Sequence, residues 1–211
     1  MFKLKINVKS NIFGLTGGIG CGKSTVGEFL KKYPDVYVFD CDKKAKDILL
    51  DNNNLNKVKS ILGESVIVDE KVDSKKVAQI IFSDDKKKKL LEDFIHPKVW
   101  QIMDKELQMV GNEKIFIVES AILFEIGKEK DIPKIIVVTC DKDEQIKRIK
   151  LRNGWSDKQI KERLKNQLLN EYKEKNGLIV IDNNCSKKKL ESKVEQVYFF
   201  IKSKKKGKIY F

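Results

Sequence analysis

Residues 17–24 read GGIGCGKS and fit the pattern G-x-x-x-x-G-K-[ST]. An apolar run at residues 12–15 precedes them, and residues 25–32, whose apolar side chains share one helical face, follow. Strand, glycine-rich loop and helix in this order cradle phosphate, because glycines let backbone N–H groups turn inward and the helix directs its positive end at the anion. A flexible glycine turn is the alternative, but the flanking elements favour a phosphate-binding loop (P-loop).

This loop supplies most of the predicted nucleotide-binding residues. Lys23 is expected to reach the β- and γ-phosphates of ATP, and the Ser24 hydroxyl is expected to bind Mg²⁺. Cys21, at a helix N-terminus, would be redox-sensitive if its pKa were lowered, but a small side chain that fits the loop is the simpler interpretation. The residues predicted to bind ATP here are Gly17, Gly18, Gly20, Cys21, Gly22, Lys23, Ser24 and Thr25.

Five short apolar runs alternate with longer charged stretches of helical character. Each run has four or five residues, is rich in Val, Ile and Phe, and is apolar at consecutive positions rather than at alternate ones. Strands buried on both faces, as in a parallel sheet covered by helices, have this pattern. We therefore expect a doubly wound α/β domain with a five-stranded parallel sheet, whose strands lie at residues 11–15, 36–39, 115–118, 135–139 and 178–181.

The 211 residues are expected to form one domain, because a chain of this length buries a sufficient core without disulfides or structural metals. Two helical stretches interrupt the alternation of strands and helices. The expected parts are a sheet core (residues 1–41, 112–147 and 176–200), a helical insertion that binds the acceptor (42–111), a lid (148–175) and a basic tail (201–211) that is mobile apart from its aromatic end.

Within the insertion, the best helix candidates are residues 86–95 and 99–110, and residues 65–68 are ambiguous. Residues 141–175 are expected to hold two helices that separate at Asn153–Gly154. Each of these two helices opens with the spacing of a capping box, formed by Asp141 and Glu144 in the first and by Ser156 and Gln159 in the second.

Carboxylates follow two of the predicted strands, at the sheet edge where open α/β folds bind ligands. Asp40 and Asp42 come just after residues 36–39. A carboxylate there could accept the proton of an attacking hydroxyl or help to hold Mg²⁺, and an Asp at this junction also commonly caps a helix. Glu119 and Glu125 follow residues 115–118, and each could face the metal, bind the acceptor or cap a helix. The predicted metal ligands are Ser24, Asp40 and Glu119.

Arginine is used sparingly and in one place. Of the 44 Lys and Arg residues only Arg148, Arg152 and Arg163 are arginines, and they fall on the two predicted lid helices. A guanidinium offers phosphate a planar, two-pronged donor that lysine cannot match. The cluster indicates a lid that closes over phosphates and neutralises charge in the transition state. Surface ion pairs with nearby glutamates, such as Glu144, are the alternative.

Composition excludes several classes of protein. The formal charge of +13 invites a nucleic-acid interpretation, but a lysine-rich surface accounts for it equally well. The four cysteines form no C-x-x-C pair and there is one histidine, so the common zinc spacings are absent and free thiols are expected. No apolar run approaches the length of a membrane span, and the first residues lack the apolar stretch and the small-residue cleavage site from which a signal peptide would be expected. We expect a cytoplasmic protein that binds neither nucleic acid nor membrane, as a monomer or a weak homo-oligomer.

The ordered motifs resemble those of the dephospho-coenzyme A kinase family. The likeness runs from Gly14 to about Ser186, and it is far more specific than the phosphate loop alone. It rests on GLTGGIGCGKS, FDCD (residues 39–42), IFSD (81–84) with FIHP (94–97), ESAILFE (119–125), the spacing of Arg148, Arg152, Arg163 and Gln167, and VIDNN (180–184).

The resemblance implies transfer of the ATP γ-phosphoryl group, with Mg²⁺, to the 3′-hydroxyl of dephospho-CoA. Asp42 matches the base for that hydroxyl, and Lys23, Arg148 and Arg152 complete the predicted catalytic set. The segment with Asn183 and Asn184 matches the loop near the adenine. Acceptor binding is expected from Asp42, His96, Glu125 and Arg163, although a buried, hydrogen-bonded histidine before a helix-starting proline (Pro97) would also explain His96. Cys21, Cys41 and Ala121 stand where the family often has Ser, Ala and Pro.

Two other functions remain open. Another small P-loop kinase, for a nucleoside monophosphate or a metabolite, would share the loop and the lid but should lack the FDCD, FIHP and ILFE series. A nucleic-acid-binding protein, suggested by charge alone, would need no phosphate loop and would bind with a steep dependence on salt.

Overall fold

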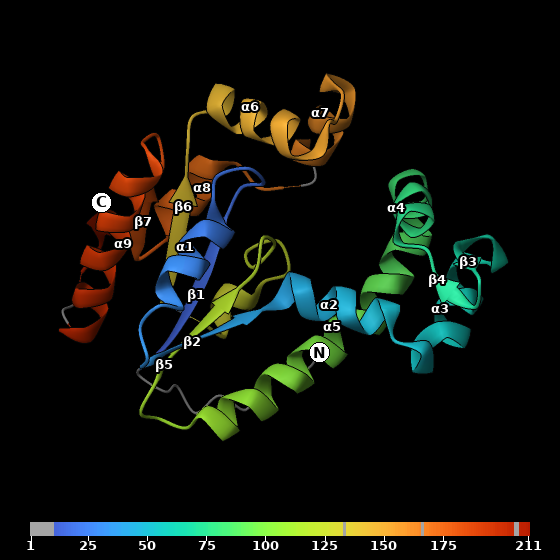
Figure 1. Ribbon diagram of the computed structural model, residues 1–211, viewed down its shortest axis with the longest axis horizontal. Helices are drawn as coiled ribbons and strands as arrows, with labels where there is room; N and C mark the ends of the chain where they lie inside the picture. Colours follow the sequence, from blue (N-terminus) through green and yellow to red (C-terminus); the bar gives the residue numbers. More distant parts are fainter. Residues whose placement is uncertain (1–10, 133, 166, 205–206) are drawn as a thin grey trace. The chain divides into compact units, whose positions relative to one another are not determined.

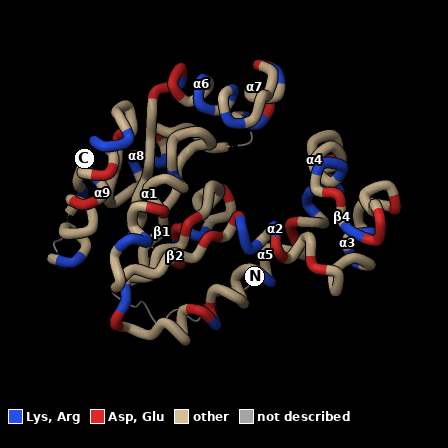
Figure 2. The backbone as a smooth tube through the Cα atoms, viewed as in Figure 1, with Lys and Arg blue, Asp and Glu red and all other residues tan. Residues whose placement is uncertain are grey.

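The computed structural model describes residues 11–132, 134–165, 167–204 and 207–211. These residues form two compact units, one of residues 40–109 and the other of residues 11–39 together with 110–211. No helix among these residues is both long and apolar enough to cross a membrane. Lys and Arg are spread over the helices of both units, with Asp and Glu between them (Figure 2).

The larger unit is built on a six-stranded sheet in the order β2-β5-β1-β6-β7-β8. Figure 1 labels its strands β2, β5, β1, β6 and β7. Neighbouring strands from β5 to β8 pair in parallel. All residues of β1, β5 and β6 are buried, which is why their apolar runs are continuous rather than alternating. The strands are β1 (Ile12–Gly17), β2 (Val36–Asp40), β5 (Ile115–Glu119), β6 (Ile135–Thr139), β7 (Ile179–Asp182) and β8 (Ile209–Tyr210).

Helices α1 (Lys23–Leu30) and α9 (Lys187–Lys202) pack on this sheet and against each other. Their buried side chains, such as Val26 and Val194, join Leu15 and Val138 of the strands in one hydrophobic core. This arrangement confirms the predicted α/β class with a parallel sheet. It also places the carboxyl ends of β1, β5 and β6 at one edge, where the phosphate loop begins.

The predicted number of five strands was wrong, because the aromatic end of the tail forms a sixth. The N–H groups of Ile209 and Phe211 donate to the carbonyl oxygens of Leu178 and Val180, at 3.0 and 2.9 Å. The Phe211 ring also packs edge-on against Phe200 of α9. A two-residue strand has no periodicity to detect, and its stability comes from a sheet edge formed far away in the sequence.

The smaller unit is mostly helical. The ambiguous residues 65–68 form the end of a 3₁₀ turn and a short strand, which pairs with its neighbour in a hairpin. Lys44 and Glu106 join the first and last helices of the unit by an ion pair of 2.7 Å. Its elements are α2 (Cys41–Leu50), a 3₁₀ turn (Asn52–Asn54), α3 (Leu55–Leu62), a second 3₁₀ turn (Glu64–Val66), β3 (Ile67–Val68), β4 (Lys71–Val72), α4 (Ser74–Ser83) and α5 (Asp85–Val110).

The two helices predicted at residues 86–95 and 99–110 are one. Helix α5 runs through Pro97 without a break, so the expectation that this proline starts a helix was wrong. Proline removes one helical hydrogen bond. The buried side chains nevertheless keep one face across it, because Ile95, Val99, Met103 and Leu107 recur every four residues. The free energy gained by burying these four side chains exceeds the cost of the helical hydrogen bond that Pro97 removes.

Residues 141–175 form three helices rather than two: α6 (Lys142–Asn153), α7 (Asp157–Lys165) and α8 (Asn170–Asn176). The predicted separation at Asn153–Gly154 is confirmed, with Gly154 in the left-handed conformation that ends α6. Before α8, the Leu168 N–H donates to the Glu125 carboxylate at 3.0 Å instead of to a helical carbonyl. That tertiary contact takes the chain out of helix between α7 and α8.

One of the two predicted capping boxes is present. The Ser156 N–H donates to Gln159 Oε1 at 3.0 Å, and the Gln159 N–H donates to Ser156 Oγ at 3.4 Å. Asp141 precedes α6, but its side chain makes no capping bond there. Instead its carboxylate accepts from Asn184, so the first box was wrong because a distant partner takes the oxygen.

Phe211→Ala should lower the free energy of unfolding by about 1 to 2 kcal/mol, less than the cost for a fully buried Phe, since its ring is half-buried. Tyr210→Ala is the matched control, because Tyr210 is 63% exposed and should change the free energy by less than about 0.5 kcal/mol. Urea unfolding of both variants measures the difference. Equal values for the two variants would show that the end of the chain does not pack as described.

Candidate active site

The phosphate loop connects β1 to α1 and occupies residues 18–22. Gly22 has a φ of 97°, and a Cβ added to it would lie 2.3 Å from Asn183 Nδ2. This position therefore requires glycine both for its backbone conformation and for the close approach of the Asn183 amide. The predicted order of strand, loop and helix is present, and the first turn of α1 carries Lys23 and the exposed Ser24.

Lys23 lies at the base of the loop and is paired with a predicted metal ligand. Its Nζ is 3.0 Å from Glu119 Oε1, and the two residues are 8% and 1% exposed. Glu119 ends β5, the strand next to β1, which explains why residues 96 positions apart meet. Two charges this deeply buried need each other, because an unpaired buried charge is expensive.

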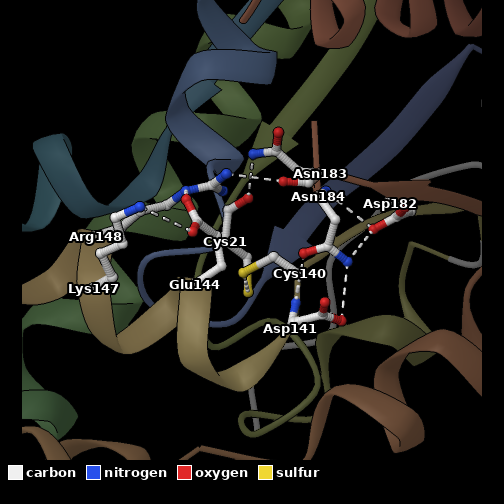
Figure 3. A network of polar contacts seen from close by, with 9 residues as sticks. All are labelled: Cys21, Cys140, Asp141, Glu144, Lys147, Arg148, Asp182, Asn183 and Asn184. Carbon is white, nitrogen blue, oxygen red and sulfur yellow. Dashed lines mark hydrogen bonds and ion pairs between the residues drawn. The ribbon is translucent and has the colours of Figure 1, made fainter. Parts of the chain in front are cut away.

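Asn183 ties the loop to the end of β7. Its side-chain Nδ2 donates to the Cys21 carbonyl at 2.8 Å, and its backbone N–H donates to the Thr139 carbonyl, also at 2.8 Å. Arg148 donates through Nη2 to the Asn183 carbonyl at 2.9 Å and through Nε to Glu144 at 3.0 Å (Figure 3). Arg148 thus makes the ion pair considered as an alternative, yet it also lies beside the phosphate loop.

One nitrogen atom of the Arg148 guanidinium makes no hydrogen bond to the described residues. Its Nη1 is buried and has no hydrogen-bond partner among the residues that the structure describes. A buried guanidinium N–H without a partner costs free energy, and an anion beside the loop would remove that cost. This atom is where the structure best fits the predicted role of Arg148 toward phosphate.

Asn184 holds the neighbouring turn together. Its Nδ2 donates to Asp182 Oδ1 at 2.7 Å and to Asp141 Oδ1 at 3.0 Å, and its Oδ1 accepts from the Asp141 N–H at 2.9 Å (Figure 3). Both predicted asparagines therefore connect the end of β7 to other parts of the site, Asn183 to the loop and Asn184 to the start of α6.

Two glutamine side chains form hydrogen bonds with the backbone of Ile19 in the phosphate loop. Gln145 Nε2 donates to the Ile19 carbonyl at 2.7 Å, and the Ile19 N–H donates to Gln167 Oε1 at 2.9 Å. Gln167 belongs to the family-like lid spacing, whereas Gln145 was missed. Its only sequence signal is a polar residue on the buried face of α6, three positions before Arg148.

Glu125 is held by a lysine that sequence reasoning missed. Lys173 is fully buried, and its Nζ lies 2.8 Å from Glu125 Oε1 and 3.2 Å from the Ala121 carbonyl oxygen. Glu125 Oε2 is buried and has no partner among the described residues. In a chain with so many surface lysines, no pattern distinguishes the one that is buried.

The other two arginines lie on the lid helices without joining Arg148. Arg152 is exposed and donates to the Asn153 side chain at 2.9 Å. The Arg163 guanidinium stacks on the Trp155 ring, 3.5 Å from the ring centre, and burial lowers its pKa. All three arginines therefore lie on α6 and α7, and Arg148 is the one whose contacts reach the segment beside the loop.

Three predicted residues belong to the smaller unit. Asp40 caps α2 by accepting the Lys43 N–H at 2.9 Å, which is the alternative considered for it. Asp42 lies exposed in the first turn of α2. His96 is half-buried in α5, and burial lowers the pKa of its imidazole from the ordinary 6.5, against the opposing effect of Glu92 and Asp93.

The predicted metal ligands offer oxygen atoms, which are the atoms that Mg²⁺ bound to a nucleotide prefers. No group of three or more His, Cys, Asp or Glu side chains among the described residues could hold a metal ion. Mg²⁺ usually takes one or two protein oxygens and completes its octahedron with phosphate and water. In the larger unit, the exposed Ser24 hydroxyl and the Glu119 carboxylate are oxygen donors of the type that this ion prefers, and in the smaller unit Asp40 carries a further carboxylate, so each of the three predicted residues is chemically suited to Mg²⁺.

Gly27→Ala tests the packing of α1 against Glu119. In a helix this change usually stabilises by about 1 kcal/mol, but a Cβ here would lie 2.4 Å from Glu119 Oε2. We expect it to destabilise by about 1 to 3 kcal/mol, because the carboxylate must move off Lys23. In a Glu119→Ala background the same change should become stabilising, as measured by urea unfolding. An unchanged sign in that background would contradict the described contact.

Comparison with known proteins shows the family to which the chain belongs. Residues 11–189 match the family model of dephospho-CoA kinase. A dephospho-CoA kinase of Fusobacterium nucleatum is 37% identical over 186 residues, covering 88% of this chain and 95% of its own, and one of Geobacter sulfurreducens is 31% identical over 192 residues, covering 89% and 97%. A solved dephospho-CoA kinase from Campylobacter jejuni superimposes with a TM-score of 0.68 at 31% identity, over 92% of this chain and 98% of its own. The chain therefore belongs to the dephospho-CoA kinase family.

Proposed function

We propose that this chain transfers the γ-phosphoryl group of ATP to the 3′-hydroxyl of dephospho-CoA, giving coenzyme A and ADP. The observation that carries the proposal is the phosphate loop with the buried Lys23 at its base, in a chain of this family. The family match over residues 11–189 includes the phosphate loop, the helices α6, α7 and α8, and the end of β7. We further propose that the reaction takes place in the cytoplasm and that the chain acts as a monomer or a weak homo-oligomer.

The ATP phosphates lie in the loop of residues 17–25. Lys23 contacts the β- and γ-phosphates, and Glu119 holds its ammonium in place when no nucleotide is bound, which avoids an unpaired buried charge. Arg148 uses its spare Nη1 toward the phosphates, while Asn183 keeps the Cys21 carbonyl turned away from them. Asn184 orders the segment beside the adenine.

We assign acceptor binding to Asp42, His96, Glu125 and Arg163. Asp42 accepts or orients the proton of the 3′-hydroxyl, which its exposed position at the start of α2 permits. His96 and Arg163 contribute to the acceptor side. Glu125 does so through Oε2, the buried oxygen that has no partner among the described residues, while its Oε1 stays paired with Lys173.

Catalysis of this kind is mostly positioning and electrostatics. Ser24, Asp40 and Glu119 are the oxygen donors that would hold Mg²⁺, which when bound neutralises charge on the β- and γ-phosphates. Arg148 and Arg152 balance the charge that spreads over the transferred group. Closure of the lid helices excludes water, so that the hydroxyl rather than water receives the phosphoryl group.

Incubation of the protein with ATP, Mg²⁺ and dephospho-CoA, followed by mass spectrometry, should show coenzyme A. Nucleoside monophosphates offered under the same conditions distinguish the alternative, since a nucleoside monophosphate kinase would form diphosphates instead. Lys23→Ala should reduce turnover at least about 10³-fold, because it removes a charge that acts in the transition state. Formation of a diphosphate but no coenzyme A would refute the proposal.

Asp42→Asn should lower kcat by about 10² to 10⁴-fold with little change in the KM for ATP, because it removes the proton acceptor and keeps the shape. Asp47→Asn is the matched control, being an exposed Asp on the same helix. Steady-state kinetics of both variants provide the measurement. Near-normal kcat in Asp42→Asn would show that Asp42 is not the base.

A further inference from the structure

Two cysteine thiols meet at the phosphate loop. Cys140 Sγ donates a hydrogen bond to Cys21 Sγ at 3.2 Å, although the two residues are 119 positions apart (Figure 3). Cys21 belongs to the loop, and Cys140 directly follows β6. Both are free and buried in the structure. A disulfide has an S–S distance of about 2.0 Å, so a closure of roughly 1 Å would join the sulfurs.

The pair is chemically asymmetric. The hydrogen bond from Cys140 lowers the pKa of Cys21 although burial acts to raise it, and the Asn170 amide, 3.7 Å from the Cys21 sulfur, lowers it further. The same hydrogen bond, together with burial, raises the pKa of Cys140. Of the two thiols, Cys21 is therefore the one that loses its proton more readily.

A cavity of about 750 Å³ opens beside the pair. Cys140 and Asn170 line it, with Gln145, Gln167 and Leu168 from the segments around α6 and α8. Asn170 also contacts the Cys21 sulfur, so one side chain separates that sulfur from a small molecule in this cavity, whereas Cys140 lines the cavity directly. The cavity provides a route to two thiols that are otherwise covered.

We propose that Cys21 and Cys140 form a reversible oxidation site, at which hydrogen peroxide converts the two thiols into a disulfide that locks the phosphate loop. The Cys21 thiolate attacks a peroxide oxygen, the O–O bond breaks, and the leaving hydroxide takes up a proton as water. Cys140 sulfur then attacks the resulting sulfenic acid, displaces its hydroxide as a second water, and forms the S–S bond. Two thiols thus lose two electrons to one peroxide, and a dithiol reverses the step.

The lock acts through the position of Cys21 in the loop. The Cys21 N–H donates to the Gly18 carbonyl at 3.0 Å, and the Cys21 carbonyl accepts from Asn183. A covalent bond to the end of β6 would hold this residue in one arrangement and prevent the loop from adjusting its N–H groups to phosphate. Loss of ATP binding on oxidation rests on the proposed kinase function, whereas formation of the disulfide does not.

The test is to treat the full-length protein with hydrogen peroxide, digest it with trypsin without reductant, and search for linked peptides. We expect peptide 10–23, which holds Cys21, joined to peptide 135–142, which holds Cys140, with two hydrogen atoms fewer than the sum of the free peptides. Kinase activity should fall at least about tenfold as this product accumulates, and dithiothreitol should restore both. Saturating ATP should slow the reaction.

Cys140→Ser should retain activity in the reduced state and yield no such product, and Cys185→Ser, a half-buried cysteine outside the pair, should behave like the unchanged chain. If the Cys140→Ser variant is destabilised and melts at a lower temperature, its activity is not informative. The linked peptides found in the unchanged chain then show whether the disulfide between Cys21 and Cys140 forms. Absence of the 21–140 link, or a full link with unchanged activity, would overturn the proposal. A link in a protein that forms no coenzyme A even when reduced would instead count against the kinase function alone.

Discussion

Two glycines leave space for side chains that come from distant parts of the chain, and the site depends on those close approaches. The Asn183 amide lies where a Cβ of Gly22 would be, and the Glu119 carboxylate lies where a Cβ of Gly27 would be. The first contact joins the phosphate loop to the end of β7, and the second joins α1 to the end of β5. A backbone that surrounds phosphate must also be fixed in position by the rest of the fold. Here the side chains that fix it can come close because Gly22 and Gly27 have no side chains of their own.

Two lysine–glutamate pairs extend this anchoring, one between two buried residues and one between a buried lysine and a half-buried glutamate. Lys23 with Glu119 and Lys173 with Glu125 connect α1 and α8 to the same short segment, residues 119–125. Buried pairs contribute little net stability, but removing one partner costs about 3 to 5 kcal/mol because the other charge stays buried. The pairs therefore specify where two helices join the segment that follows β5. Two buried polar atoms of this unit, Arg148 Nη1 and Glu125 Oε2, have no hydrogen-bond partner among the residues that the structure describes.

Much of the fold could be predicted from local patterns. Continuous apolar runs located five strands, and Gly154 marked the end of a helix, because each signal depends on residues close in the sequence. The failures came from distant partners. The Glu125 carboxylate ends the helix before Leu168, Asn184 takes the oxygen expected to cap α6, and the sheet edge recruits the strand at Ile209. For the site, the loop was evident, whereas Gln145, Lys173 and the contact between Cys21 and Cys140 were not.

The sequence by itself determined the phosphate loop, the α/β class and the family, because these depend on residue types at short spacings and on motifs in a given order. Only the tertiary structure decided which charges are buried together, which arginine lies beside the loop, and that Cys21 has a second thiol 3.2 Å away. The physical reason is that such contacts form where parallel strands end at a common edge. That edge brings together residues separated by about a hundred positions, and no local pattern records which of them will meet.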